Sequence, residues 1–313
     1  MKNIILLILL GGFLIISCDM ETVIDLDIPP HEPVLVLNGF LDTDTNARVI
    51  VSHSVGAFSN EVPSFINNAD VMLYKDNQFV DSFLLDTTNL VYANYYSDYN
   101  TGLLPMYYYT SGHIPDKDAI YRVEVEHSDY NSVSSQTYIP GDISLYNIDV
   151  DTISNSEDIG FTFSFDDNTS QQNYYRLKLY SSCKSDLEEY EKGYLVMMSN
   201  DPSFPSDFPQ EGYTFIGDEV LFTDDLFNGQ SKTITLDVAF EYYEFKNTDC
   251  DTIIIEFSTF SDDTYSYYNS LGDHSAKGEL GIFGGEVIPV YSNVENGLGV
   301  LISNNSQQVY LKP

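Results

Sequence analysis

The segment AIYRVEVEH, residues 119–127, alternates between apolar and polar side chains. Val123 and Val125 fall on one face of an extended chain, and Arg122 falls on the other. A period of two is the pattern of a β-strand with one buried face and one solvated face. Residues 160–165, GFTFSF, repeat this pattern. The chain therefore contains half-buried strands in both of its halves.

Composition extends this interpretation to the whole chain of 313 residues. The hydrophobic fraction is 43%, with 25 Tyr and 19 Phe, which is enough apolar material for a folded core. Short runs rich in Val, Ile and Thr recur between Asn, Asp and Gly, and such runs favour strands over helices. We predict an all-β protein of two tandem β-sandwich domains, in the style of immunoglobulin and fibronectin III domains.

The tripeptide IPG at residues 139–141 is the predicted domain boundary, because Pro cannot donate to a strand ladder and Gly tolerates positive φ. One sandwich is therefore expected at residues 34–140 and the other at residues 141–313. The second contains a proline-rich loop insertion at residues 201–211. It also contains the one predicted short helix, residues 262–272, which begins at an Asp cap and ends at a glycine.

The N-terminus reads MKNIILLILLGGFLIISC, with one Lys followed by an apolar run and a final Ser-Cys. This is the pattern of a secretory signal peptide, and the apolar run is too short to span a membrane. The ending resembles the bacterial lipobox, whose cysteine carries acyl chains such as palmitate after cleavage. We expect a lipoprotein signal peptide at residues 1–17, lipidation of Cys18 and an acidic tether at residues 18–33. The alternative is a secreted protein in which Cys18 is incidental.

The two remaining cysteines are Cys183 and Cys250. In an oxidising compartment they can form a disulfide, which would stabilise the fold by about 4 kcal/mol on the chain-entropy model. Two separate thiols are an equally good interpretation, because the sequence does not show whether the two residues approach each other.

Charge and motifs exclude several classes of function. The chain carries 48 Asp and Glu against 13 Lys and Arg, a net charge of −35, which excludes nucleic acid as the principal partner. No G-x-S-x-G, P-loop, G-x-G-x-x-G or HExxH motif is present, so we predict no enzyme activity, catalytic residue, cofactor or metal site. Asp42, Asp44 and Asn46 have the spacing of the first three ligands in a calcium-binding loop. Ala47 stands where that loop requires Gly, so a polar turn is expected instead. A hydrolase with an unrecognised site is the least supported alternative.

Aromatic clusters are the candidate binding residues. Consecutive aromatic residues on a strand cannot all face a core, and exposed tyrosines suit sugar stacking or a protein interface. The alternative is that cross-strand aromatic pairs brace an outer sheet face. The candidates are Tyr95, Tyr96, Tyr107, Tyr108, Tyr109, Tyr242 and Tyr243.

Residues 284–300, GGEVIPVYSNVENGLGV, resemble the closing motif of a Bacteroidota lipoprotein family that carries the domain of unknown function 4249. The segments NADVMLY at residues 68–74 and YYRL at residues 174–177 agree with this resemblance, as does the YxxYxxL pattern at residues 265–271. One departure is the ending, since the family motif usually runs to a Gly-Ala pair and here LISN follows at residues 301–304.

The resemblance implies an outer-membrane lipoprotein that works with a TonB-dependent receptor. The acidic residues directly after Cys18 look like the surface-export signal of such lipoproteins, so a cell-surface location is expected. The predicted function is a non-enzymatic accessory protein that docks on an outer-membrane β-barrel, for substrate capture, uptake or complex assembly. The alternative is a free-standing surface lipoprotein that binds a glycan or a peptide.

Overall fold

Strand β7, Ala119–His127, buries the face that its alternating sequence predicts, because Tyr121, Val123 and Val125 are all inaccessible to solvent. The computed structural model is almost entirely built of strands in packed sheets, which confirms the predicted all-β sandwich fold. All strands and the helix below belong to the unit Pro33–Pro313. The structure describes residues 31–56, 61–97, 100–152, 159–169, 171–184, 190–206, 212–238, 249–278 and 289–311.

The strands of the first half precede the predicted boundary at Pro140. They are β1 (Leu35–Asp42), β2 (Arg48–His53), β3 (Asp70–Lys75), β4 (Gln78–Ser82), β5 (Leu84–Ser97), β6 (Asn100–Thr110), β7 (Ala119–His127) and β8 (Tyr130–Ile139).

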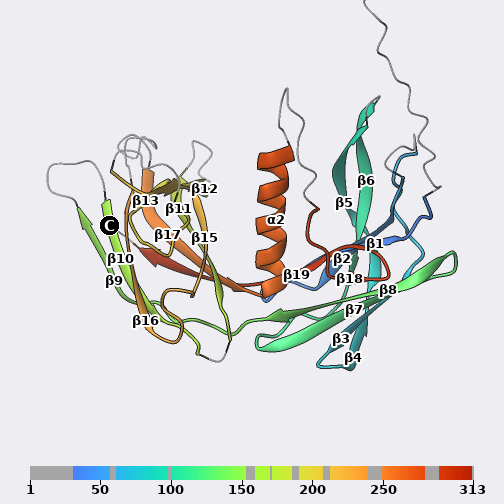
Figure 1. Cartoon of the computed structure of the whole chain (residues 1–313), viewed down its shortest axis with the longest axis horizontal. Coiled ribbons are helices and arrows are strands. Elements are labelled where there is room, and N and C mark those ends of the chain that lie inside the picture. The colour runs from blue at the N-terminus through green and yellow to red at the C-terminus, as the bar shows by residue number, and fades with distance from the viewer. Residues whose placement is uncertain are drawn as a thin grey trace, which may run out of the picture. The chain divides into compact units, whose positions relative to one another are not determined.

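The second half contains further strands and the helix α2 (Figure 1). The elements are β9 (Tyr146–Thr152), β10 (Ile159–Asp166), β11 (Tyr174–Lys184), β12 (Tyr190–Tyr194), β13 (Met197–Ser199), β14 (Phe215–Gly217), β15 (Glu219–Thr223), β16 (Ser231–Val238), β17 (Asp249–Phe260), α2 (Asp262–Gly278), β18 (Val294–Glu295) and β19 (Leu298–Leu311).

The strands form one large sheet and two smaller sheets. The large sheet has the order β12-β11-β17-β19-β1-β2-β6-β5, and β15 also pairs with β11. The smaller sheets have the orders β18-β8-β7-β3-β4 and β14-β13-β16-β10-β9. The large sheet supplies one layer of each sandwich, and each smaller sheet supplies the opposite layer of one.

Each sandwich has its own hydrophobic core. The first core draws on residues 35–139 and on Leu301, and the second draws on residues 159–257, with Val309 packed against it. Pro140 lies between the two sets in sequence. Both cores are closed by side chains from β19, so the final strand is common to the two sandwiches.

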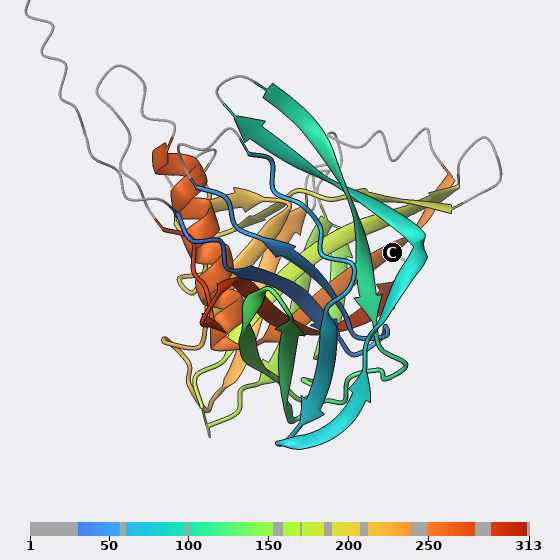
Figure 2. The same cartoon turned by 90° about the vertical axis from the view of Figure 1, so that its right-hand side faces the viewer.

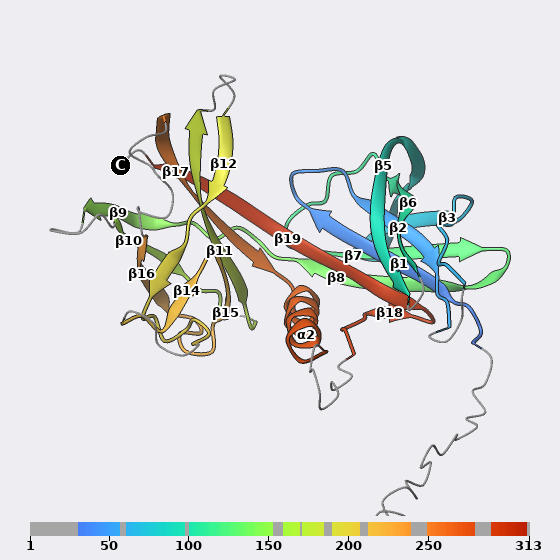
Figure 3. The ribbon, with the colours of Figure 1, turned by 90° about the horizontal axis from the view of Figure 1, so that it is seen from above.

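Strand β19 joins the two sandwiches through its backbone (Figure 3). Its first part pairs in parallel with β1, with Leu298 opposite Val36 and Asn304 opposite Asp42. Its second part pairs antiparallel with β17, from Asn305 onward. A single continuous strand therefore carries the ladder of hydrogen bonds from one sandwich into the other.

Helix α2 begins at Asp262 as predicted, but it extends to Gly278 instead of ending at Gly272. The carboxylates of Asp262 and Asp263 lie in the first turn, where they oppose the positive end of the helix dipole. A glycine inside a helix costs about 1 kcal/mol relative to Ala, which is too little to end a helix that is already propagating.

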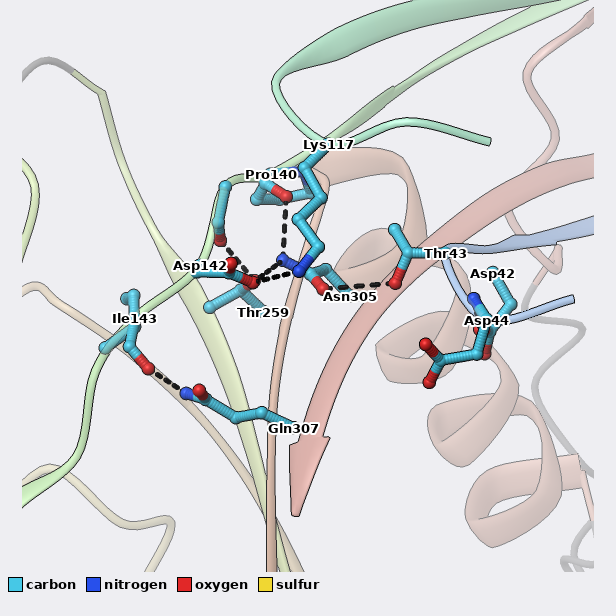
Figure 4. A network of polar contacts seen from close by, with 11 residues as sticks. Asp42, Thr43, Asp44, Lys117, Pro140, Asp142, Ile143, Thr259, Asn305 and Gln307 are labelled. Atoms are coloured by element: carbon cyan, nitrogen blue, oxygen red, sulfur yellow. Dashed lines mark hydrogen bonds and ion pairs between the residues drawn. The ribbon is translucent and has the colours of Figure 1, made fainter. Parts of the chain in front are cut away.

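A polar network lies where the chain passes between the sandwiches (Figure 4). The Asn305 side chain, which is buried, donates to Pro140 O at 3.1 Å and to Asp142 Oδ1 at 3.2 Å, and it accepts from Thr43 Oγ1 at 3.2 Å. Lys117 Nζ pairs with Asp142 at 2.6 Å. Hydrogen bonds from the lysine and from Asn305 hold the pKa of Asp142 below its usual value. The network fixes the linker between the sandwiches onto β19.

Candidate functional site

The β5–β6 hairpin leaves its sheet as a two-stranded ribbon. Strand β2 pairs with β6 only at Tyr109 and Thr110, whereas β5 follows β6 along almost its whole length. Among the described residues, the remainder of β6 therefore has β5 as its sole neighbour. Figures 1 and 2 show this hairpin, in teal, extending beyond the other strands of its sheet.

A local irregularity in β5 marks the point where the ribbon departs. The pairing register shifts between Asp86 and Leu90. The backbone N–H and Oγ1 of Thr88 donate to Asp86 Oδ1 at 2.9 and 2.6 Å, and Asn89 Nδ2 donates to Asp86 Oδ2 at 2.7 Å. These hydrogen bonds lower the pKa of the Asp86 carboxyl, because they favour its charged form. The extra residues form a bulge, and a bulge bends its strand.

The ribbon is apolar on both faces. Tyr92 is 59% exposed and Leu103 is 61% exposed, and the register places them on the same face because Tyr92 pairs with Pro105 and Asn94 pairs with Leu103. The opposite face carries Val91, Ala93, Leu104 and Met106. Over residues 87–108 the one charged residue is Asp98, in a chain where 19% of residues are charged.

This ribbon is the best candidate for an interaction surface. Soluble proteins rarely expose a contiguous apolar patch without a partner for it. Strand β5 is also the end of its sheet, so its outer edge pairs with no described strand. Natural proteins usually protect such an edge with charged residues, and β5 has none between Thr87 and Ser97.

The predicted tyrosines of β6 fasten the ribbon to the sandwich. Tyr109 is buried, donates to Ile66 O at 2.9 Å and accepts from the N–H of Ala69 at 3.0 Å. Burial raises the pKa of the Tyr109 hydroxyl. Tyr107 contacts Phe65 edge-on at 6.0 Å between ring centroids.

Tyr108 lies under the guanidinium of Arg48, at 4.8 Å from its ring centroid. Tyr107 and Tyr108 therefore contact their own sandwich and Tyr109 belongs to its core, and a role for these tyrosines in an interface stays a prediction. Tyr95 and Tyr96 belong to β5 at the far end of the ribbon, opposite Gly102 and Thr101. Tyr242, Tyr243 and Cys18 lie outside the described residues.

Sequence reasoning did not single out Tyr92 and Leu103 as individual residues. Tyr92 lies at the start of the YANYYSDY run, but Leu103 lies in a segment that was not predicted as a strand. The available signal was the low charge of residues 87–108, where Asp98 is the one charged residue, combined with two apolar runs on either side of a short polar segment.

The closing segment of the chain agrees with the resemblance that its sequence shows. Asn296 adopts φ +60° in the turn between β18 and β19, and Gly299 adopts φ +106° against the carbonyl of Leu37. A family model described as "Domain of unknown function (DUF4249)" matches residues 21–309. The chain belongs to the DUF4249 family.

Two solved structures show a distant similarity to this DUF4249 protein. The first is the B domain of a biofilm-associated protein, which is 10% identical with a TM-score of 0.20, over 89% of this chain and 86% of that chain. The second is trypsin-activated alpha-2-macroglobulin from Escherichia coli, which is 12% identical with a TM-score of 0.19, over 76% of this chain and 15% of that chain. No curated protein matches the sequence.

The acidic turn at residues 42–46 of the DUF4249 chain is held by hydrogen bonds between its side chains and the backbone. Asp42 Oδ1 accepts the N–H of Asp44 at 2.7 Å, and Asn46 Nδ2 donates to Ser111 O at 2.9 Å, so this segment forms a polar turn. Within the described ranges, no group of three carboxylate, imidazole or thiol side chains is arranged to hold a metal ion. In that same part of the chain, no helix has the length and apolar character needed to cross a membrane.

The two internal cysteines lie opposite each other in the sheet. The register of β11 and β17 pairs Cys183 with Cys250 directly, beyond an irregularity after Ser182. Directly opposed residues on antiparallel strands have Cα atoms about 4.5–5.5 Å apart, which is within the range that a disulfide requires. The disulfide between them stays a prediction, now with a backbone arrangement that favours it.

Proposed function

We propose that this DUF4249 protein is a non-enzymatic accessory lipoprotein that docks on an outer-membrane β-barrel through its β5–β6 ribbon. The barrel in this proposal is a TonB-dependent receptor, and the role is substrate capture and uptake or assembly of the receptor complex. The observation that carries the proposal is the solvent-exposed ribbon, in which Asp98 is the one charged residue and whose outer edge pairs with no described strand.

The chemistry of the ribbon suits a partner built of strands. Its free edge can accept another strand through backbone hydrogen bonds, and the exposed Tyr92 and Leu103 can fill apolar pockets beside that strand. Because a closed barrel has no free strand edge, the long extracellular loops of an outer-membrane β-barrel are the part that can supply such a strand.

The proposed anchor keeps the ribbon near such a partner. Lipids on Cys18 would hold the chain at the membrane, since several acyl chains on one residue give stable binding. The tether at residues 18–33 spans at most about 55 Å when fully extended, at about 3.5 Å per residue. In this proposal, strand β1, which follows the tether, lies no more than about 55 Å from the lipid anchor.

Affinity purification from detergent-solubilised outer membranes tests the docking. We expect the wild-type lipoprotein to recover a β-barrel protein in comparable amount, and a Tyr92→Ser, Leu103→Ser double variant to lose most of it. Leu226→Ser is the matched control, because Leu226 is 62% exposed but lies in the second sandwich. Wild-type protein recovered without any barrel, or a double variant that recovers as much barrel as Leu226→Ser, would contradict the proposal.

Fractionation tests the anchor separately. Cys18→Ala should move the protein from the membrane fraction to the soluble fraction, whereas Cys250→Ala should leave it in the membrane. Protease added to intact cells then decides the side. Digestion without lysis supports the cell surface, and resistance until lysis places the protein on the periplasmic leaflet.

A further inference from the structure

The second sandwich has an outer face on the large sheet that resembles a platform. On β11, the side chains of Tyr175, Leu177 and Leu179 enter the core, so the intervening residues face the other way. The register carries one row of side chains across four neighbouring strands, β12, β11, β17 and β19 (Figure 3). This aromatic row consists of Tyr194, Tyr180, Ile254 and Tyr310.

The aromatic row has an exposed tyrosine ring at each end and two buried side chains between them. Tyr194 is 47% exposed and Tyr310 is 62% exposed, whereas Tyr180 and Ile254 are buried. The two exposed rings are three strand spacings apart, which corresponds to about 14 Å. A flexible chain of several sugar rings can bridge this span, and a single sugar ring cannot.

The next row along the strands supplies hydrogen-bonding groups. Gln308 Nε2 donates to Glu256 Oε2 at 2.9 Å, and Tyr310 OH donates to Gln308 Oε1 at 2.8 Å. Lys178 Nζ pairs with Glu219 at 2.9 Å and lies 5.8 Å from the ring centroid of Tyr194. Amide, carboxylate and ammonium groups therefore lie beside the aromatic row, where they can meet the hydroxyl groups of a ligand that lies along it.

The charges of this face balance. Among the side chains that the structure describes on this part of the face, Lys178 and Arg176 are the cations and Glu219 and Glu256 are the anions. Arg176 lies 4.0 Å from Glu219 and 3.9 Å from Glu256. The chain as a whole carries a net charge of −35, so a neutral face is an exception on this protein. A face of this kind does not attract ions of either sign, and it suits an uncharged ligand rich in hydroxyl groups.

The opposite end of the same face is covered by helix α2. Tyr265 stacks on Tyr174 at 4.7 Å between ring centroids, and Tyr268 contacts Phe260 at 6.4 Å. The helix thus accounts for the aromatic side chains at that end, while the Tyr194 and Tyr310 rings remain open to solvent.

We propose that this face, bounded by Tyr194 and Tyr310, binds a neutral oligosaccharide or polysaccharide chain. The tyrosine rings stack on the apolar faces of two sugar rings, and the Glu256, Gln308 and Lys178 row hydrogen-bonds to hydroxyl groups between them. This site lies on different strands from the β5–β6 ribbon, so it adds a ligand to the docking role and does not depend on it.

Affinity electrophoresis of the detergent-solubilised lipoprotein tests the proposal, with dextran, mannan, laminarin and arabinoxylan each cast in a native gel. We expect at least one of these polysaccharides to retard the wild type. Tyr194→Ala and Tyr310→Ala should each weaken that binding by about tenfold, the effect of losing one aromatic contact. Tyr310→Phe should retain most of the binding, because it keeps the ring.

Phe79→Ala is the matched control, since the Phe79 ring is 57% exposed but lies on β4 of the first sandwich, away from both proposed surfaces. It should leave retardation unchanged, and unaltered thermal unfolding of all four variants would show that their folds are intact. Absence of retardation by every neutral polysaccharide would overturn the proposal. Retardation that survives both alanine variants, or binding to anionic polysaccharides or peptides alone, would overturn it as well.

Discussion

At the scale of single residues, Asp224 is a buried carboxyl group whose hydrogen bonds are incomplete among the described residues. Its side chain is 1% exposed, and Oδ2 accepts from the N–H and the Nδ2 of Asn173 at 2.9 and 3.2 Å. Its other oxygen, Oδ1, has no hydrogen-bond partner among the described residues. Burial raises the pKa of the Asp224 carboxyl, and the nearby Asp167 carboxylate raises it further.

This arrangement predicts a specific dependence of stability on pH. A raised pKa in the folded state means that the contribution of Asp224 to stability is fully present below the pKa of the unfolded chain, about 3.9. It is lost as the pH rises through the folded-state value. The stability of Asp224→Asn relative to wild type should therefore be higher at pH 8 than at pH 4. Denaturant unfolding of wild type and variant at pH 4 and at pH 8 measures the difference in free energy of unfolding between them. If this difference were the same at both pH values, the raised pKa of Asp224 would be contradicted.

At the scale of elements, the start of β19 depends on Gly299. Its φ of +106° is unfavourable for residues with a side chain, and an added Cβ would overlap the carbonyl oxygen of Leu37 on β1. The parallel pairing of β1 and β19 begins at this point. The sequence GLG in the closing motif predicts a close backbone approach at Gly299, and the structure shows that the approach is to Leu37 on β1.

Gly299→Ala should destabilise the protein by at least about 2 kcal/mol, because it adds both a strained φ and a backbone overlap. Gly272→Ala is the matched control, since nothing lies within 4 Å of a Cβ at Gly272 inside helix α2. That control should stabilise the protein by about 0.5–1 kcal/mol. Thermal unfolding measures the change in stability of both variants. If Gly299→Ala were as stable as Gly272→Ala, the close approach of Gly299 to β1 would not be required.

The pairing of β11 with β17 gives a prediction for the cysteines. Since Cys183 and Cys250 are directly opposed, we expect mass spectrometry of the non-reduced protein to find their peptides linked. Replacing both residues with Ser should lower stability by about 4 kcal/mol on the chain-entropy model. Free thiols at both positions in protein isolated without reductant would refute the disulfide.

At the scale of the whole molecule, the two sandwiches are joined by side chains as well as by β19. Asn305→Ala would leave Pro140 O, Asp142 and Thr43 without their shared partner, at a cost of about 1–3 kcal/mol. The control is Asn68→Ala, because the Asn68 amide makes an exposed contact with His127 and should matter by less than about 0.5 kcal/mol. Thermal unfolding of both variants measures their loss of stability. If Asn305→Ala lost no more stability than Asn68→Ala, the backbone of β19 alone would hold the two sandwiches together.

Local patterns in the sequence predicted the strands and not their long-range pairing. The alternation of residues 119–127 and 159–165 correctly indicated β7 and β10, and Asp262 correctly marked the start of α2. The dual pairing of β19 has no local signal, because it depends on strands more than a hundred residues apart in one case.

The sequence predicted the presence of exposed aromatic residues but not their identity, because their exposure depends on long-range strand pairing. A run of aromatic residues shows that some must be exposed, but only the pairing of strands decides which ones. Tyr109 reaches the core because β2 pairs with β6 at that residue. Tyr92 pairs with Pro105, in the part of the hairpin where β6 pairs with β5 and with no other described strand. The platform of Tyr194 and Tyr310 likewise exists only once four strands are in register.

The position of β19 also determines when the protein can fold. The ribosome makes β1 before all other described strands and β19 after all of them, yet the two are neighbours in one sheet. Until β19 emerges, the first core lacks Leu301 and the second lacks its neighbour to β17. Neither sandwich is complete before β19 has been made, so we expect the two sandwiches to finish folding together and not one after the other.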